Sequence, residues 1–250
     1  MKKLQLSASQ FKMFKSCPRK HYFRYKEKIK EPTTKALKDG LEFHSIIENI
    51  LLETPFKKTP SDDILTLVQT AFEVGCMDFE EEEFYVEKKI KLDIDDFHYM
   101  IGFIDLLLIS PNIVTICDHK TIKSVQWGLT KDQLKCDLQM MVYGKWVIEN
   151  YPVDIIRFRH NQINKEDPLK STSIKVDVTI DEIESYWKKI LKVSPHIDLF
   201  RKKEVASEVV TRNACNDYGG CYYYKIGKCS GHVDKLDKNI SRISNKYKNV

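Results

Sequence analysis

The chain has 250 residues, of which 42% are hydrophobic and 31% are charged, so it can bury the core of one large domain or two small ones. Its formal net charge of +5 is modest, and no apolar run approaches the ~20 residues that a membrane-spanning helix needs. Residues 1–7 lack the long apolar segment of a secretory signal, so we expect a cytoplasmic protein with no membrane partner.

The first third of the chain predicts helices. Ser7 and Ser9 can cap a short helix that ends near residue 16, and Pro18 suits the first turn of a second helix. Apolar residues at helical spacing predict a long helix over about 35–52 and another over about 62–72.

The hydrophobic period then changes to that of strands. Alternating residues predict strands at about 84–94, 97–109, 113–120, 154–163 and 171–178. A helix is expected over about 131–150, and Thr179 or Asp181 can cap a last helix that reaches about residue 200. This order predicts an α/β (α+β) fold, with a mixed central sheet flanked by helices.

Basic residues gather at both ends of the chain. Residues 2–30 hold ten lysines and arginines against the single acid Glu27, and aromatic residues such as Phe14 and Tyr22 are interleaved with them. Such blocks can bind phosphates and stack bases. Charge alone slightly favours an ordinary solvated helix face, so nucleic acid is a plausible partner at this point and no more.

Two acids and a lysine fall on the second and third expected strands. Asp105 follows Gly102 on one strand, and Asp118 and Lys120 share a face of the next because side chains alternate. Two neighbouring carboxylates call for a cation, and oxygen ligands favour Mg²⁺ or Mn²⁺. About six acid-x-base triplets are expected by chance in this composition, so the triplet alone is weak.

Three further polar residues fall on expected helices. His44 lies in the inward stripe of its helix with Leu37, Leu41 and Glu48, where it could join the acids as a ligand or be an ordinary core histidine. Gln139 and Tyr143 are four residues apart beside an apolar face. They either form a polar rim or bind the lysine, a metal-held water or a DNA backbone.

Seven cysteines is an odd number, and three of them, Cys215, Cys221 and Cys229, lie close together near the end of the chain. In a cytoplasmic protein such a group favours metal or cluster binding over disulfides.

Taken in order, these residues resemble the RecB-like branch of the PD-(D/E)XK nucleases, which includes CRISPR-associated exonucleases and the AddB-type nuclease domain. The matching segments are 6–9, 17–22, Gly40 with His44, 102–105, 118–120, Gln139 with Tyr143, and the late cysteines. Each motif is weak alone, and their joint order makes the resemblance specific. Ile104 stands where the family name has proline, and Asp118 where Glu is more frequent.

The resemblance implies a restriction-endonuclease-like core and a role for each of these residues. His44, Asp105, Asp118 and the backbone carbonyl of His119 would bind Mg²⁺ or Mn²⁺, and Lys120 would be the catalytic lysine. Gln139 and Tyr143 would order the site and the DNA.

The resemblance also implies a [4Fe–4S] cluster that joins the two ends of the chain. Its ligands would be Cys17, Cys215, Cys221 and Cys229. The late cysteines are spaced more widely than in cluster-bearing relatives, so Zn²⁺ on the same residues, with His232, is an alternative.

We therefore expect one nuclease domain over residues 1–230 and a basic tail over 231–250. The expected activity is metal-dependent DNA exonuclease action on single strands or ends, in recombination, repair or processing, with a helicase or recombination protein as a further partner. The alternatives are an inactive DNA-binding scaffold and a zinc-stabilised interaction protein.

Overall fold

The computed structural model describes residues 3–81, 83–212, 215 and 220–231. The chain forms two compact units: the first contains residues 1–32, 93–100 and 188–250, and the second contains 33–92 and 101–187. The expectation of a single domain over 1–230 stays a prediction. Residues 232–250, which make up nearly all of the expected basic tail, lie outside the described residues, as does His232.

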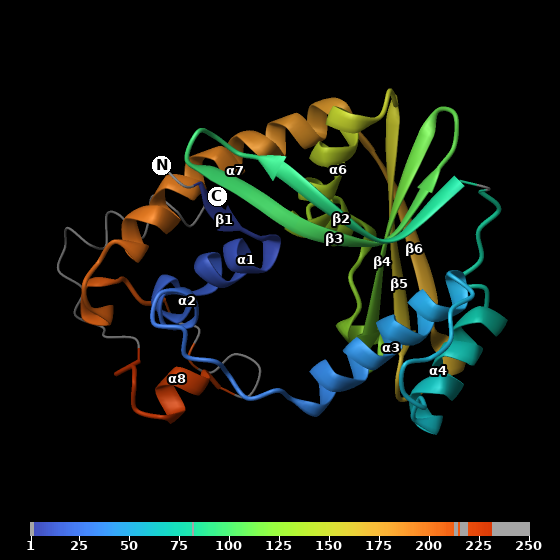
Figure 1. Cartoon of the computed structure of the whole chain (residues 1–250), viewed down its shortest axis with the longest axis horizontal. Coiled ribbons are helices and arrows are strands. Elements are labelled where there is room, and N and C mark those ends of the chain that lie inside the picture. The colour runs from blue at the N-terminus through green and yellow to red at the C-terminus, as the bar shows by residue number, and fades with distance from the viewer. Residues whose placement is uncertain (1–2, 82, 213–214, 216–219, 232–250) are drawn as a thin grey trace. The chain divides into compact units, whose positions relative to one another are not determined.

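In the described part of the chain, the second unit holds most of the sheet, with four whole helices and the start of a fifth. Figure 1 shows these elements. Its helices are α3 (Lys35–Leu51), α4 (Asp62–Glu73), α5 (Lys131–Lys135), α6 (Leu138–Asn150) and the start of α7 (Ile180–Arg201). Its strands are β2 (Glu83–Asp93), β3 (His98–Ile109), β4 (Ile113–Ile122), β5 (Ile155–Asn164) and β6 (Thr172–Thr179), of which β2 and β3 also have residues in the first unit.

The sheet is mixed, as the sequence predicts. Strand β3 pairs with β4 in antiparallel orientation, β4 with β5 in parallel, and β5 with β6 in antiparallel, while β2 pairs with β3. The register of β4 and β5 places Asp118 beside His160 and Lys120 beside Gln162. The charged residues of β4 therefore face a polar stretch of β5.

Helices cover both faces of this sheet. Helices α3 and α4 pack on each other through Phe43, Ile47 and Val68, and Ile163 of β5 belongs to the same core. On the other face Gly144 of α6 lies so close to Phe158 that a Cβ there would be 3.3 Å from the ring. Residues 158 and 163 point to opposite faces because an odd number of steps separates them, so β5 is buried from both sides (Figure 1).

The expected helix over 131–150 is interrupted, and that prediction is wrong in this detail. Helix α5 ends at Lys135, and Asp137 begins α6 by accepting hydrogen bonds from the backbone N–H groups of Gln139 and Met140. An aspartate at this position is a strong helix N-cap, so the chain turns here and α6 starts anew. Gln139 is therefore in the first turn of α6.

The first unit brings together segments that are distant in the sequence. It contains β1 (Leu4–Leu6), α1 (Ala8–Ser16), α2 (Pro18–Tyr25), the end of α7 and α8 (Tyr222–Lys225). Tyr22 donates its hydroxyl hydrogen bonds to the carbonyls of Lys203 and Glu204, and Tyr223 donates to the carbonyl of Ile29. These buried tyrosines tie residues 22–29 to the late part of the chain.

In the part of the chain that the structure describes, no helix combines the length and the apolar character needed to cross a membrane.

Candidate active site

The two carboxylates expected on neighbouring strands lie at the point where β3 and β4 separate. The paired residues end with Leu106 opposite Cys117, which makes Asp105 and Asp118 the next positions on the two strands. Asp105 accepts a hydrogen bond of 2.7 Å from the backbone N–H of His119. The structure therefore brings together two acids that are 13 positions apart in the sequence.

Three side chains hold the buried carboxylate of Asp118. Lys120 Nζ donates to its Oδ1 at 2.6 Å and Gln139 Nε2 donates to the same atom at 2.8 Å. His160 Nε2 lies 3.3 Å from Oδ2. Gln139, expected to bind the lysine, a metal-held water or a DNA backbone, contacts Asp118 in the structure, and its expected role stays a prediction.

His44 reaches the cluster from α3. Its Nδ1 lies 3.7 Å from Asp105 Oδ2 and 3.7 Å from Glu87 Oε1. Ligand atoms of His44, Glu87 and Asp105 all lie within 4.8 Å of one another, which suits one cation. Glu48 shares the predicted helix face with His44, but the glutamate that lies beside His44 in the structure, Glu87, comes from β2.

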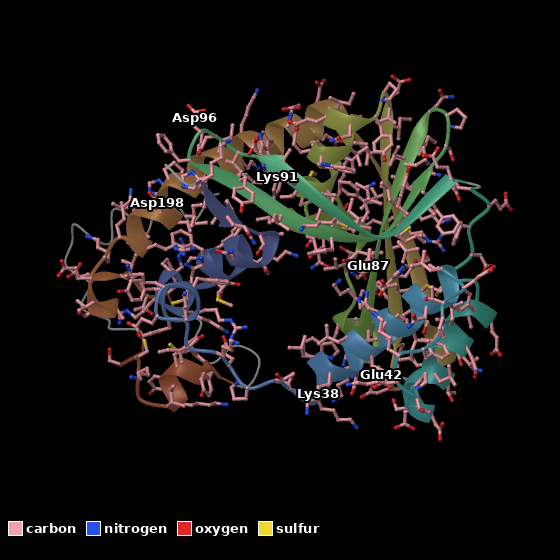
Figure 2. The ribbon with its side chains drawn as sticks, in the orientation of Figure 1. Lys38, Glu42, Glu87, Lys91, Asp96 and Asp198 are labelled. Atoms are coloured by element: carbon pink, nitrogen blue, oxygen red, sulfur yellow. The ribbon has the colours of Figure 1, made fainter. Side chains whose placement is uncertain are left out.

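Glu87 is a functional candidate that the sequence does not single out. It occupies an ordinary polar position in an alternating strand, equivalent to Lys89 and Lys91. Its backbone φ of 48° is unfavourable for a residue with a Cβ. Strained backbone of this kind concentrates at functional sites. Figure 2 labels Glu87.

Asp118 lies outside the group of three ligands that are already close enough to share an ion. Its Oδ1 is occupied by Lys120 and Gln139. The assignment of Asp118 as a metal ligand, like the assignment of the His119 carbonyl, stays a prediction.

Tyr143 of α6 lies against β3, near Asp105. A Cβ added to Gly102 would be 2.5 Å from its ring, so the two residues are in close contact. Burial, followed by the negative charges of Asp105 and Asp118, raises the pKa of its hydroxyl. Tyr143 is therefore neutral, and its expected role in ordering the site and the DNA stays a prediction.

The surroundings shift the pKa values of Asp105 and Asp118 in opposite directions. Burial, with the charge of Asp118 added, raises the pKa of Asp105 from 3.8 to about 6. Burial also opposes ionisation of Asp118, but the Lys120 ammonium and the contact with His160 outweigh it and lower the pKa of Asp118. Asp118 in turn raises the pKa of Lys120 against the effect of burial.

The pKa values of His44 and His119 also shift in opposite directions. Burial lowers the pKa of His44, but the hydrogen bond to Glu87 and the charge of Asp105 reverse this and raise it. Burial, then the charge of His44, lowers the pKa of His119 to about 3. His119 is neutral, and its Nδ1 lies 3.0 Å from the side-chain nitrogen of Asn161.

The four cysteines expected at a cluster lie around one cavity of the first unit. The cavity has an empty volume of about 280 Å³, including the part open to solvent. Its lining includes Cys17, Cys215, Cys221 and Cys229, with Lys20 and Arg212 among the other residues. The seven cysteines of the chain form no disulfide.

These cysteines are more widely spaced than a single small ion requires. A zinc–sulfur bond is about 2.3 Å, so tetrahedral zinc holds its sulfurs about 4 Å apart. Within the described residues, no three of the cysteine sulfurs lie within 4.8 Å of one another. The lining is basic as well, and Arg19 directs a guanidinium N–H toward the Cys229 sulfur at 3.9 Å.

The model of the PD-(D/E)XK nuclease superfamily matches residues 5–89, about a third of the 250 residues. The match includes His44 and Glu87, and it ends before Asp105 and Lys120. No curated protein matches the chain.

Two solved structures have a similar fold. A protein from Eubacterium rectale, described as a "Putative exonuclease", has a TM-score of 0.55 and 14% identity, over 95% of this chain and 92% of that one. The protein SSO0001 has a TM-score of 0.43 and 13% identity, over 82% of this chain and 79% of that one. At these identities the likeness to the first structure concerns the fold alone, and no argument is drawn from the second.

Proposed function

We propose that this chain is a metal-dependent nuclease of the PD-(D/E)XK type, in its RecB-like branch, that hydrolyses phosphodiester bonds of DNA. The observation that carries the proposal is the Asp118–Lys120 pair at 2.6 Å beside Asp105, with His44 and Glu87 next to that acid. The match of the superfamily model supports a nuclease. The description of the Eubacterium rectale protein favours an exonuclease.

The residues present fit a divalent cation. His44, Glu87 and Asp105 offer one nitrogen and two carboxylates within 4.8 Å, and we add Asp118 and the His119 carbonyl as the remaining ligands. Mg²⁺ or Mn²⁺ held there would act as a Lewis acid toward the scissile phosphate. A cation would also offset the burial and the charge of Asp118, which together raise the pKa of Asp105.

The side chains around the proposed cation site position the reacting groups. Lys120 keeps its proton because Asp118 lies 2.6 Å away, so its ammonium can orient the attacking water and stabilise charge on the phosphate. Gln139 and His160 hold the Asp118 carboxylate and thereby fix the position of Lys120. Tyr143, neutral and buried beside Gly102, limits the access of water.

We also propose a [4Fe–4S] cluster on Cys17, Cys215, Cys221 and Cys229. The cavity that these residues line and the wide spacing of the sulfurs favour a cluster over zinc. Arg19, Lys20 and Arg212 would offset the negative charge of the thiolates. Iron and sulfide analysis of anaerobically purified protein tests this assignment, and stoichiometric zinc without iron would contradict it.

A role in DNA recombination, repair or processing, with a helicase or recombination partner, and a cytoplasmic location are part of the same proposal. They rest on the resemblance to the RecB-like branch and on the absence of disulfides among the seven cysteines.

The test is cleavage of end-labelled single- and double-stranded DNA with Mn²⁺, Mg²⁺ or EDTA. We expect metal-dependent cleavage that Lys120→Ala abolishes and that Lys175→Ala, at an exposed lysine of β6, leaves unchanged. Mononucleotides released from an end would support an exonuclease. Retained DNA binding without cleavage by the wild-type protein would instead support the inactive scaffold.

A further inference from the structure

The three tryptophans of the chain differ sharply in exposure. Trp127 is 63% exposed, whereas Trp146 is 8% and Trp187 is 7% exposed. An indole ring is large and mostly apolar, so leaving it in water gives up the free energy that its burial would provide. Trp127 therefore presents an aromatic face on which a ligand or a partner can pack.

Trp127 lies on a short turn that is fixed beside the proposed catalytic strand. The turn, Val125–Trp127, begins three residues after the end of β4, and Lys120 is seven residues before Trp127. Gln162, the register neighbour of Lys120 on β5, donates a hydrogen bond of 2.7 Å to the carbonyl of Leu129. Gly128 packs against the same glutamine so closely that a Cβ would meet its Oε1 at 1.6 Å.

A second group of exposed apolar side chains lies on α3, which approaches the same end of β4. Leu37 and Leu41 are 53% and 62% exposed, so the expectation that their stripe of the helix turns inward is wrong for these two residues. They share a helix face with His44. Gly40, between them, lies so near β4 that a Cβ would be 3.8 Å from Thr121 Oγ1. The exposed face of α3 therefore runs from His44 to Leu37, and it passes beside Thr121, the residue that follows Lys120.

Exposed lysines accompany both groups. Lys38 lies on α3, where Figure 2 labels it, and Lys123 lies between β4 and the Trp127 turn. The Lys123 side chain is 76% exposed, and its ion pair with Glu166 is loose at 3.6 Å. Apolar or aromatic surface with lysines beside it suits a strand with unpaired bases, because the bases can stack while the phosphates meet ammonium groups.

We propose that Trp127 stacks on an unpaired base of single-stranded DNA, on a path that continues along Leu37 and Leu41 of α3 to the site at Lys120. The proposal rests on the nuclease function and deepens it, since it names the form of DNA that the second unit receives. Base stacking on an aromatic ring tolerates any sequence. Trp127 would therefore favour single strands without selecting a particular base.

Tryptophan fluorescence provides a direct test on the full-length protein. In EDTA, where cleavage is prevented, oligothymidine should quench the emission of wild-type protein, because Trp127 is the exposed indole among the three. Trp127→Phe should lose the quenching yet keep its affinity within about threefold, since a phenyl ring also stacks. Quenching that persists in this variant would overturn the proposal.

Binding affinity gives the second readout. Trp127→Ala should weaken oligothymidine binding by about 5- to 150-fold, the range expected for one stacked base, and should leave binding of blunt-ended duplex nearly unchanged. Ile155→Ala, at a 38% exposed apolar residue at the opposite end of β5 from Gln162, serves as the control and should bind as wild type. Unchanged oligothymidine affinity in Trp127→Ala, or equal weakening for duplex, would refute the stacking role.

Failure of this inference is distinguishable from failure of the nuclease assignment. If oligothymidine quenches the wild-type protein and binds Trp127→Ala more weakly, but the wild type does not cleave DNA in Mn²⁺, the single-strand path is supported and the nuclease assignment is rejected. Cleavage by wild-type protein, with Trp127→Ala binding single strands normally, would reject the path alone.

Discussion

Asp105→Asn should stabilise the metal-free protein while removing its activity. Burial and the charge of Asp118 raise the pKa of Asp105 from 3.8 to about 6, so the folded state resists ionisation of this carboxyl. At about 1.4 kcal/mol for each pKa unit, ionised Asp105 costs the fold about 3 kcal/mol at neutral pH. Asparagine has nearly the same shape and can still accept the hydrogen bond from the His119 backbone.

The pH dependence of this effect follows from the direction of the pKa change. Above pH 6 Asp105 is ionised in both the folded and the unfolded protein, and the full cost is present. As the pH falls from about 6 toward 3.8 the folded protein binds the proton first, so the cost disappears. The advantage of Asp105→Asn should therefore be largest near pH 7.5 and should vanish near pH 4.

The measurement is urea unfolding of both proteins in EDTA at several pH values, repeated at pH 7.5 with Mn²⁺. Mn²⁺ should stabilise the wild type and have much less effect on Asp105→Asn, since a ligand carboxylate is lost. Equal or lower stability of Asp105→Asn at pH 7.5 in EDTA would refute the argument that the ionised Asp105 carboxylate destabilises the metal-free protein.

Three further predictions concern other residues of the two sites. Glu87→Gln should weaken Mn²⁺ binding in calorimetry by at least about tenfold while Lys120 is untouched, and unchanged affinity would remove Glu87 from the ligand set. Gly102→Ala should lower the free energy of unfolding by about 1–3 kcal/mol because its methyl group would meet the Tyr143 ring at 2.5 Å, whereas Gly40→Ala, with 3.8 Å to its nearest neighbour, should not destabilise the fold. Cys221→Ser should reduce the iron content and the visible absorbance of anaerobically purified protein, and an unaltered spectrum would exclude Cys221 as a ligand.

The sequence by itself determined the elements and part of the site. Alternating and helical periodicity located the strands and most of the helices, because these patterns follow from local geometry. Asp118 and Lys120 could be placed on one face of a strand for the same reason, and the structure puts them 2.6 Å apart. The break at Asp137 was also readable in principle, since aspartate is a common helix N-cap.

The tertiary structure decided which residues from distant parts of the chain lie beside Asp118 and Lys120. Residues 159–162 of β5 are all polar, yet all four are buried. His160 lies beside Asp118, and Gln162 holds the Trp127 turn through its hydrogen bond to Leu129. Glu87 enters through strand pairing and an unusual φ, neither of which an alternating pattern encodes. Register and packing across the sheet depend on the whole chain, so only the folded protein brings these side chains to the acids.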